Sequence, residues 1–197
     1  MYPCRVLEPF FLASASPQRK ILLEGLGLRF RVEPSSIDES ACTEKDPATR
    51  AVLLAKLKAR DVAKRFSDGW VLGCDTLVVA SSGELLEKPK DAKDAERMIR
   101  LQSGSTSVVH SGVCLRSPQG REWTGCDSST VTFATLSDEE IRRWIEKGLW
   151  EGRSGAFQID GPGQLLISRI EGDWTGIVGL PVFLLGELLR RAEQKIT

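Results

Sequence analysis

The alternation of short β-like runs with helical apolar spacing is the feature that most constrains how this chain folds. Residues 10–13, 30–33 and 70–80 predict buried strands, whereas residues 17–26 and 48–66 carry apolar side chains at the roughly 3.6-residue spacing of helices. Such alternation is typical of an α/β fold. At 197 residues, the chain can bury a sizeable core but is too short for a large multidomain machine.

The second half of the chain continues the alternation. Residues 106–116 and 121–134 flank a Ser-Pro-Gln-Gly turn and predict an antiparallel hairpin. We also expect helices over residues 91–101, after the capping residue Ser137 and over 182–192, and a strand over 165–170. Within the apolar run 70–80, the polar residues of 73–76 are expected to break the strand.

The charge balance excludes a strong overall electrostatic attraction to nucleic acid or to an anionic membrane. Lys plus Arg and Asp plus Glu both number 27, so the formal net charge is zero. We therefore expect no stable nucleic-acid binding and no attraction to an anionic membrane. An anionic ligand has to be held by a local site.

Cysteine usage and hydropathy indicate a cytoplasmic protein. The five cysteines are scattered, include no CxxC pair and share the chain with a single histidine, so we expect reduced thiols rather than disulfides or a zinc site. The most apolar stretch, residues 176–185, is far shorter than the roughly 18 to 20 residues that a membrane span needs.

The junction at residues 12–19, Leu-Ala-Ser-Ala-Ser-Pro-Gln-Arg, is the first candidate site. A strand runs there into a helix N-terminus, with Ser14 in the turn and Arg19 in the first helical turn. Free backbone N–H groups and the helix dipole favour an anion at such a place. An ordinary capped helix with a surface arginine is the alternative interpretation.

Asp75 is the second candidate, because a carboxylate inside an apolar strand needs a cation. Lys88 or Mg²⁺ could supply that charge, and a structural Asp at a turn is the alternative.

The Gly-rich stretch 152–163 is the third candidate. Its small residues allow a backbone to approach a ligand closely, and Arg153 and Asp160 offer polar contacts. A plain flexible loop would have the same composition.

Seven short motifs together resemble the Maf family, the septum-formation-inhibitor-like nucleoside triphosphate pyrophosphatases. The resemblance covers nearly the whole chain, and the motifs occur in order: LASASPQR at 12–19, IDE at 37–39, LAKLKA at 54–59, GCDT at 73–76, EKP at 87–89, SGAFQIDG at 154–161 and VGLP at 178–181. It implies a single Maf-like domain over residues 1–197. The implied fold is an elongated mixed sheet with flanking helices and two lobes around a cleft, related to inosine triphosphate pyrophosphatases.

The resemblance also implies a reaction and its residues. The family hydrolyses a nucleoside triphosphate between the α and β phosphates, releasing the monophosphate and pyrophosphate with a divalent cation, Mg²⁺ or Mn²⁺. Asp75 matches the general base, and Glu39 matches a second acidic position that would share the metal. The positions that match residues around the triphosphate are Ser14, Arg19, Lys58 and Lys88, and Arg153 stands where we expect a lysine in relatives.

Three positions bear on the choice of base: Gln18, Thr76 and Asp160. Thr76 resembles the dTTP/UTP branch of the family, whereas an acidic residue at 160 resembles the branch that acts on 7-methyl-GTP. We expect dTTP/UTP or related and modified nucleotides, with 7-methyl-GTP as the alternative.

Two other function classes remain. A weakly catalytic nucleotide-binding regulator of cell division would not need the base Asp75 or its neighbours, and a Mg²⁺-dependent monophosphatase would release orthophosphate. The residues leave open whether the chain forms a homodimer.

Overall fold

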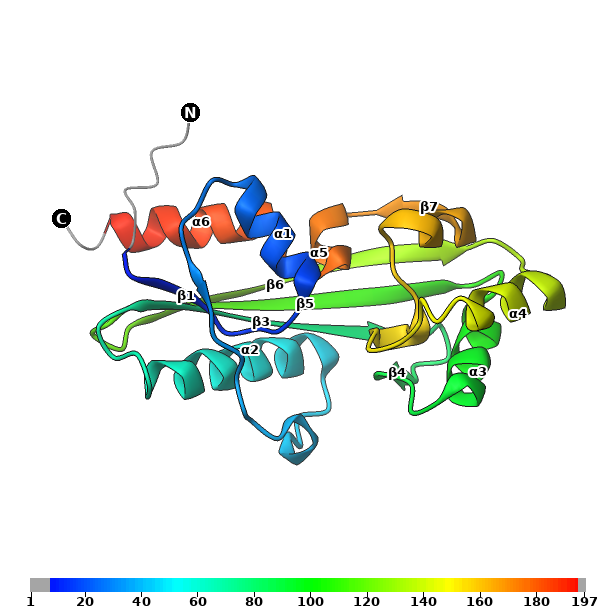
Figure 1. Cartoon of the computed structure of the whole chain (residues 1–197), viewed down its shortest axis with the longest axis horizontal. Coiled ribbons are helices and arrows are strands. Elements are labelled where there is room, and N and C mark those ends of the chain that lie inside the picture. Colours follow the sequence, from blue (N-terminus) through cyan, green and yellow to red (C-terminus); the bar gives the residue numbers. More distant parts are fainter. Residues whose placement is uncertain (1–7, 195–197) are drawn as a thin grey trace. The chain divides into compact units, whose positions relative to one another are not determined.

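The computed structural model describes residues 8–194 as strands and helices around one mixed sheet (Figure 1). The strands are β1 (Phe10–Leu12), β2 (Arg31–Val32), β3 (Trp70–Val79), β4 (Leu85–Leu86), β5 (Thr106–Arg116), β6 (Glu122–Phe133) and β7 (Ile167–Glu171). The α-helices are α1 (Pro17–Gly25), α2 (Pro47–Ala63), α3 (Ala92–Gln102), α4 (Asp138–Glu146), α5 (Trp174–Val178) and α6 (Val182–Glu193). Three 3₁₀ helices complete the chain, η1 (Glu39–Ala41), η2 (Ser154–Ala156) and η3 (Gly161–Leu166).

The sheet has seven strands in the order β2-β1-β3-β5-β6-β7, and β4 pairs with β3. Strand β1 runs parallel to both β2 and β3, with Leu12 opposite Leu72. Strands β4 and β7 are antiparallel to β3 and β6. The expected mixed α/β sheet with flanking helices is confirmed.

The chain divides into two compact units. The first contains the described residues up to Asp75, together with Ser111–Asp127 and those from Gly179 on, and the second contains Thr76–His110 and Ser128–Val178. Strands β3, β5 and β6 each contribute residues to both units.

Strict alternation along the strands gives the first unit a core on each sheet face. Phe10, Leu12, Trp70 and Leu72 pack in a cluster that includes residues of α1 and α6, whereas the odd-numbered residues of the same strands pack with α2. Side chains alternate between the faces of a sheet, so this pattern follows from the sequence. In Figure 1, α1 and α6 lie on one side of these strands and α2 on the other.

Two glycines allow α2 to approach the sheet closely. A Cβ atom at Gly73 of β3 would lie 2.1 Å from the carbonyl oxygen of Ala55, and one at Gly112 of β5 would lie 2.4 Å from that of Ala51. Real Cβ atoms essentially never come so near, so a larger residue at either place would push α2 away. The buried face of α2 is correspondingly rich in alanine.

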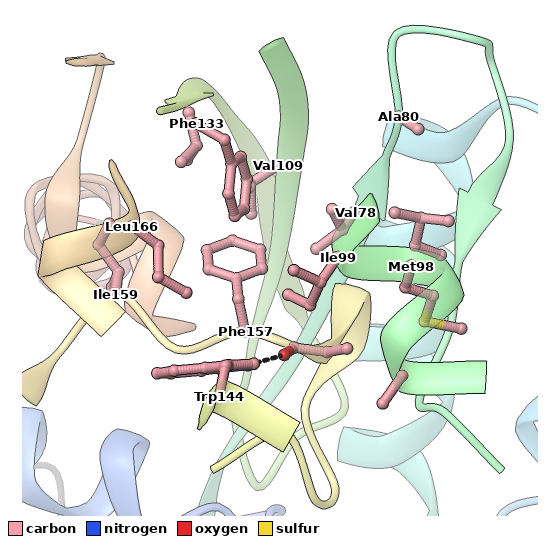
Figure 2. Packing of buried hydrophobic residues seen from close by; sticks show 14 of the residues in the cluster. Val78, Ala80, Met98, Ile99, Val109, Phe133, Trp144, Phe157, Ile159 and Leu166 are labelled. Atoms are coloured by element: carbon pink, nitrogen blue, oxygen red, sulfur yellow. Dashed lines mark hydrogen bonds between the residues drawn. The ribbon is translucent and has the colours of Figure 1, made fainter. Parts of the chain in front are cut away.

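The second unit has its own apolar core. Val109 of β5 and Phe133 of β6 pack there with Ile99 and Met98 of α3 and Trp144 of α4, as Figure 2 shows. Phe157 enters the same cluster from the Gly-rich segment, and its ring meets that of Phe133 edge to face, with the centroids 5.1 Å apart. The Gly-rich segment is therefore tied to a core.

Some sequence-based boundaries were wrong. β3 continues through residues 73–76 without the expected break, because the glycine serves close helix packing and Asp75 has a cationic partner. The expected strand 165–170 begins at Ile167, since residues 161–166 form η3, and α5 was not expected.

The described cysteines, Cys42, Cys74, Cys114 and Cys126, are free thiols, and Cys4 lies outside the described residues. Among residues 8–194, no helix has the length and apolar character that crossing a membrane requires.

Candidate active site

The centre of the candidate site in the first unit is a buried lysine between two carboxylates. Lys58 of α2 donates from Nζ to Oδ1 of Asp75 at 2.6 Å, and the same Nζ lies 2.9 Å from Oε1 of Glu39. The Asp75 side chain is only 5% exposed, whereas that of Glu39 is 46% exposed. The structure thus brings together three of the expected residues. The Lys58 ammonium contacts both carboxylates, of which Asp75 is buried and Glu39 is about half exposed.

Strand alternation explains why Asp75 meets α2. Val71 of β3 packs in the same cluster as Ala55 and Ala59 of α2, and Gly73 lies against the backbone of that helix. Asp75 is the next residue with the same parity and therefore points to the same face. Lys58 reaches it there because the helix approaches the strand closely.

One oxygen of the buried Asp75 carboxylate, Oδ2, has no hydrogen-bond partner among the described residues. Unsatisfied buried polar atoms are uncommon in folded proteins and call for an explanation. An oxygen in this state can accept a proton or bind a cation.

The turn between β1 and α1 forms a second part of the site in the first unit. The Ser14 hydroxyl is buried and accepts hydrogen bonds from the Ser16 backbone N–H at 3.2 Å and from Nη1 of Arg19 at 3.0 Å. Nε of Arg19 also donates to the Gly179 carbonyl at 2.8 Å. Ser16 caps the helix, and its hydroxyl donates to Oε1 of Gln18. The guanidinium is therefore oriented at the helix N-terminus.

The electrostatic surroundings of Cys74 link these two groups of residues. Burial raises the pKa of the Cys74 thiol to about 11, while the positive charges of Arg19 and Lys58 oppose that rise. Both cations therefore act on one point of β3, next to Asp75. The thiol stays protonated at neutral pH and is not a nucleophile.

The segment that carries Glu39 is anchored to α2 by Asp61. Oδ2 of Asp61 accepts hydrogen bonds from the Ser36 backbone N–H at 2.9 Å and from the hydroxyls of Ser35 and Ser36. Asp61 lies one turn beyond Lys58 on the same helix. Helix α2 therefore carries Lys58 and also binds Ser35 and Ser36, which shortly precede Glu39.

These contacts predict an acid-sensitive contribution to stability. The Ser36 backbone hydrogen bond, helped by both serine hydroxyls and Arg65, lowers the pKa of Asp61. A carboxyl whose pKa is lower in the folded state stabilises the fold above its unfolded pKa, and this stabilisation is lost as the pH falls through the folded pKa. We expect Asp61→Asn to lower the free energy of unfolding by about 1 kcal/mol at pH 7.

Urea denaturation of Asp61→Asn and wild type at several pH values checks this expectation. The difference should shrink below about pH 4, where the unfolded carboxyl becomes protonated. A difference that stays constant down to pH 2 would contradict the assignment.

The other expected residues belong to the second unit. The exposed side chain of Lys88 and the half-buried one of Arg153 form no hydrogen bond or ion pair among residues 8–194. Their segments meet through the backbone, because the Gly155 N–H donates to the Glu87 carbonyl at 3.2 Å. The Thr76 carbonyl accepts from the Ser154 hydroxyl at 3.4 Å.

Asp160 precedes η3, and its carboxylate makes no capping hydrogen bond. Like Lys88 and Arg153, it is a charged side chain without a described partner. The Gly-rich stretch contains η2 and the start of η3.

Sequence reasoning missed two buried or anchoring polar residues, Asp61 and Gln102. Gln102 follows Ala95, Met98 and Ile99 at the spacing i, i+3, i+4, i+7 on the apolar face of α3, and all four are buried. A glutamine in such a place was the available signal, since a buried amide needs partners. Asp61 gave no comparable signal, because its serine partners lie 25 and 26 residues away in the chain.

Comparisons with known proteins show which family the chain belongs to. The family model described as Maf-like protein matches residues 9–192. A protein of Koribacter versatilis named dTTP/UTP pyrophosphatase is 43% identical over 181 residues, which is 92% of this chain and 93% of the relative. A protein of Moorella thermoacetica with the same name is 44% identical over 184 residues, covering 93% and 94% of the two chains.

A solved nucleoside-triphosphatase / dITP/XTP pyrophosphatase from Mycobacterium abscessus aligns with a TM-score of 0.41 and 16% identity, covering 65% of this chain and 74% of that one. This likeness is too low to support an argument. The family match over residues 9–192 and the relatives that cover more than 90% of both chains show that the chain belongs to the Maf-like protein family.

Proposed function

We propose that this protein is a nucleoside triphosphate pyrophosphatase that hydrolyses dTTP and UTP to the monophosphate and pyrophosphate. The observation that carries the proposal is the buried Asp75 carboxylate, with Oδ1 paired to Lys58 and Oδ2 without a partner among the described residues. The relatives that match over more than 90% of both chains bear the name dTTP/UTP pyrophosphatase, which supports the choice of reaction and substrate.

Asp75 is the proposed general base. A water molecule forms a bond to phosphorus while the anhydride bond between the α and β phosphates breaks and pyrophosphate leaves. The proton of the water passes to Asp75, for which Oδ2 is the available atom. The Lys58 ammonium keeps the carboxylate oriented through Oδ1 at 2.6 Å.

Cationic side chains are proposed to neutralise the phosphates. In the first unit, Arg19 with Ser14 lies at the N-terminus of α1, where backbone N–H groups and the helix dipole favour an anion. In the second unit, Lys88 and Arg153 carry charges that no described group balances. Cations held at these places form charge-assisted hydrogen bonds with phosphate oxygens and so strengthen binding of the triphosphate.

The carboxylates of Asp75 and Glu39 fit a divalent cation such as Mg²⁺ or Mn²⁺. Such hard ions prefer oxygen ligands, and Oδ2 of Asp75 is a buried oxygen without a described partner. Within residues 8–194, no group of three or more His, Cys, Asp and Glu side chains could hold a metal alone. One or two carboxylates with substrate phosphates and water is the usual Mg²⁺ arrangement. When bound, the ion would neutralise phosphate charge.

Gln18, Thr76 and Asp160 are the proposed determinants of base choice. The Asp160 carboxylate is an acceptor without a capping bond, which suits the N3–H donor of thymine or uracil. Guanine also presents N–H donors, so 7-methyl-GTP is the competing substrate.

Pyrophosphate release is the experiment that tests the function. We expect release from dTTP and UTP with Mg²⁺ or Mn²⁺, with kcat/KM at least about tenfold above that for CTP, GTP and 7-methyl-GTP, since one well-placed polar contact is worth about 1.4 kcal/mol or more. Orthophosphate release would instead support a phosphatase. Nucleotide binding with no turnover under any condition would support the regulator of cell division.

A further inference from the structure

Gln102 is a fully buried amide whose polar atoms all have partners within the second unit. Its Nε2 donates to the Gly155 carbonyl at 2.7 Å and to the Met98 carbonyl at 3.1 Å, while its Oε1 accepts from the Ser107 hydroxyl at 3.1 Å. The side chain thus joins the end of α3, the start of β5 and the first turn of the Gly-rich segment. The contact with Gly155 spans 53 residues of sequence.

Gly155 in turn contacts or adjoins the segments that carry Lys88 and Arg153, two cationic side chains without a described partner. Its carbonyl accepts from Gln102, and its N–H donates to the Glu87 carbonyl at 3.2 Å, next to Lys88. Arg153 lies two residues before it. The Gly155 backbone therefore connects the Lys88 segment and the Arg153 segment to one buried side chain.

The backbone at Gly155 and Ala156 has positive φ angles, which contacts with surrounding residues have to stabilise. Gly155 has φ +72°, and Ala156 has φ +60°, which is unusual for a residue with a side chain. Such conformations persist where the surroundings hold them, and they cluster at functional sites. The Ala156 carbonyl accepts from the indole Nε1 of Trp144 at 2.9 Å, the dashed line in Figure 2, so buried donors hold two consecutive carbonyls.

We propose that Gln102 is a positioning residue for triphosphate binding, which holds Arg153 and Lys88 in place through the two hydrogen bonds of Gly155. This inference rests on the proposed function. Gln102 does not touch the substrate. It determines where the backbone of the two cationic segments lies, and displacements of about 1 Å are enough to weaken a charge-assisted contact with phosphate.

The test compares Gln102→Met with Ser107→Ala. Methionine has a similar length but leaves the Gly155 and Met98 carbonyls without the amide donor. Ser107→Ala removes a hydrogen bond from the same buried cluster while the bond to Gly155 stays, so it is the matched control. If Gln102→Met does not fold, Gln102→Asn, which remains polar but is one methylene shorter, replaces it.

We expect Gln102→Met to raise KM for dTTP and the inhibition constant of inorganic pyrophosphate about tenfold, with kcat changed less than threefold. Contacts made equally in the ground and transition states appear in KM. Ser107→Ala should leave both constants within twofold of wild type. Unchanged constants in folded Gln102→Met, or equal changes in both variants, would overturn the positioning role.

Titration calorimetry with pyrophosphate separates this inference from the proposed function. If wild type binds pyrophosphate but hydrolyses no triphosphate, the proposed function fails alone, and the ratio of Kd between Gln102→Met and wild type still decides the role of Gln102. A tenfold ratio supports the role, and a ratio near one overturns it. Failure of wild type to bind either pyrophosphate or dTTP would overturn both.

Discussion

Replacement of Asp75 by asparagine is expected to reduce pyrophosphate release from dTTP by at least about 10³-fold, within the range that a general base contributes. An amide has the shape of the carboxylate but cannot take a proton from the attacking water. The asparagine oxygen can still accept from Lys58, which also keeps Glu39 at 2.9 Å. The fold should therefore persist, and the loss should appear in kcat.

Asp68→Asn is the matched control for this experiment. Asp68 undergoes the same chemical change in the same unit, but it is exposed and precedes β3. Its turnover should equal that of wild type. Circular dichroism of both variants reports the fold, and turnover of Asp75→Asn within a few-fold of wild type would remove Asp75 from the catalytic role.

Replacement of Lys58 by methionine is expected to lower the free energy of unfolding by about 3 kcal/mol, because it leaves the buried Asp75 carboxylate without its partner. The side chain of Lys58 is 11% exposed and that of Asp75 is 5% exposed, so water cannot replace the lost contact. Glu39 contributes little to this loss, since it is half exposed.

A double variant tests the physical reason. Lys58→Met combined with Asp75→Asn removes the buried charge as well, so most of the lost stability should return in urea denaturation at pH 7. The matched control is Lys56→Met on the same helix. Lys56 lies 3.9 Å from Glu122 and is 32% exposed, and its loss should change stability by less than about 1 kcal/mol. A loss in Lys58→Met as small as that of Lys56→Met would contradict the buried pairing.

Local chemistry that lies within a few neighbouring residues was predictable from the sequence. Ser16, Asp91 and Ser137 cap their helices through side-chain bonds to backbone N–H groups three residues later, and the capping box of α4 is present. Short apolar runs at residues 10–13 and 70–80 likewise indicated buried strands. For the same reason Asp75 could be recognised as a residue in need of a cation.

The sequence indicated that Asp75 needs a cation, with Lys88 or Mg²⁺ as the expected source, and the tertiary structure decided that Lys58 is its protein partner. Lys58 lies 17 residues earlier in the chain, and it reaches Asp75 because Gly73 and Gly112 let α2 approach β3 and β5. Gln102 meets Gly155 in the same way, across 53 residues. Pairings of this kind depend on how closely separate elements pack, and that distance is set jointly by residues far apart in sequence, so local patterns do not reveal it.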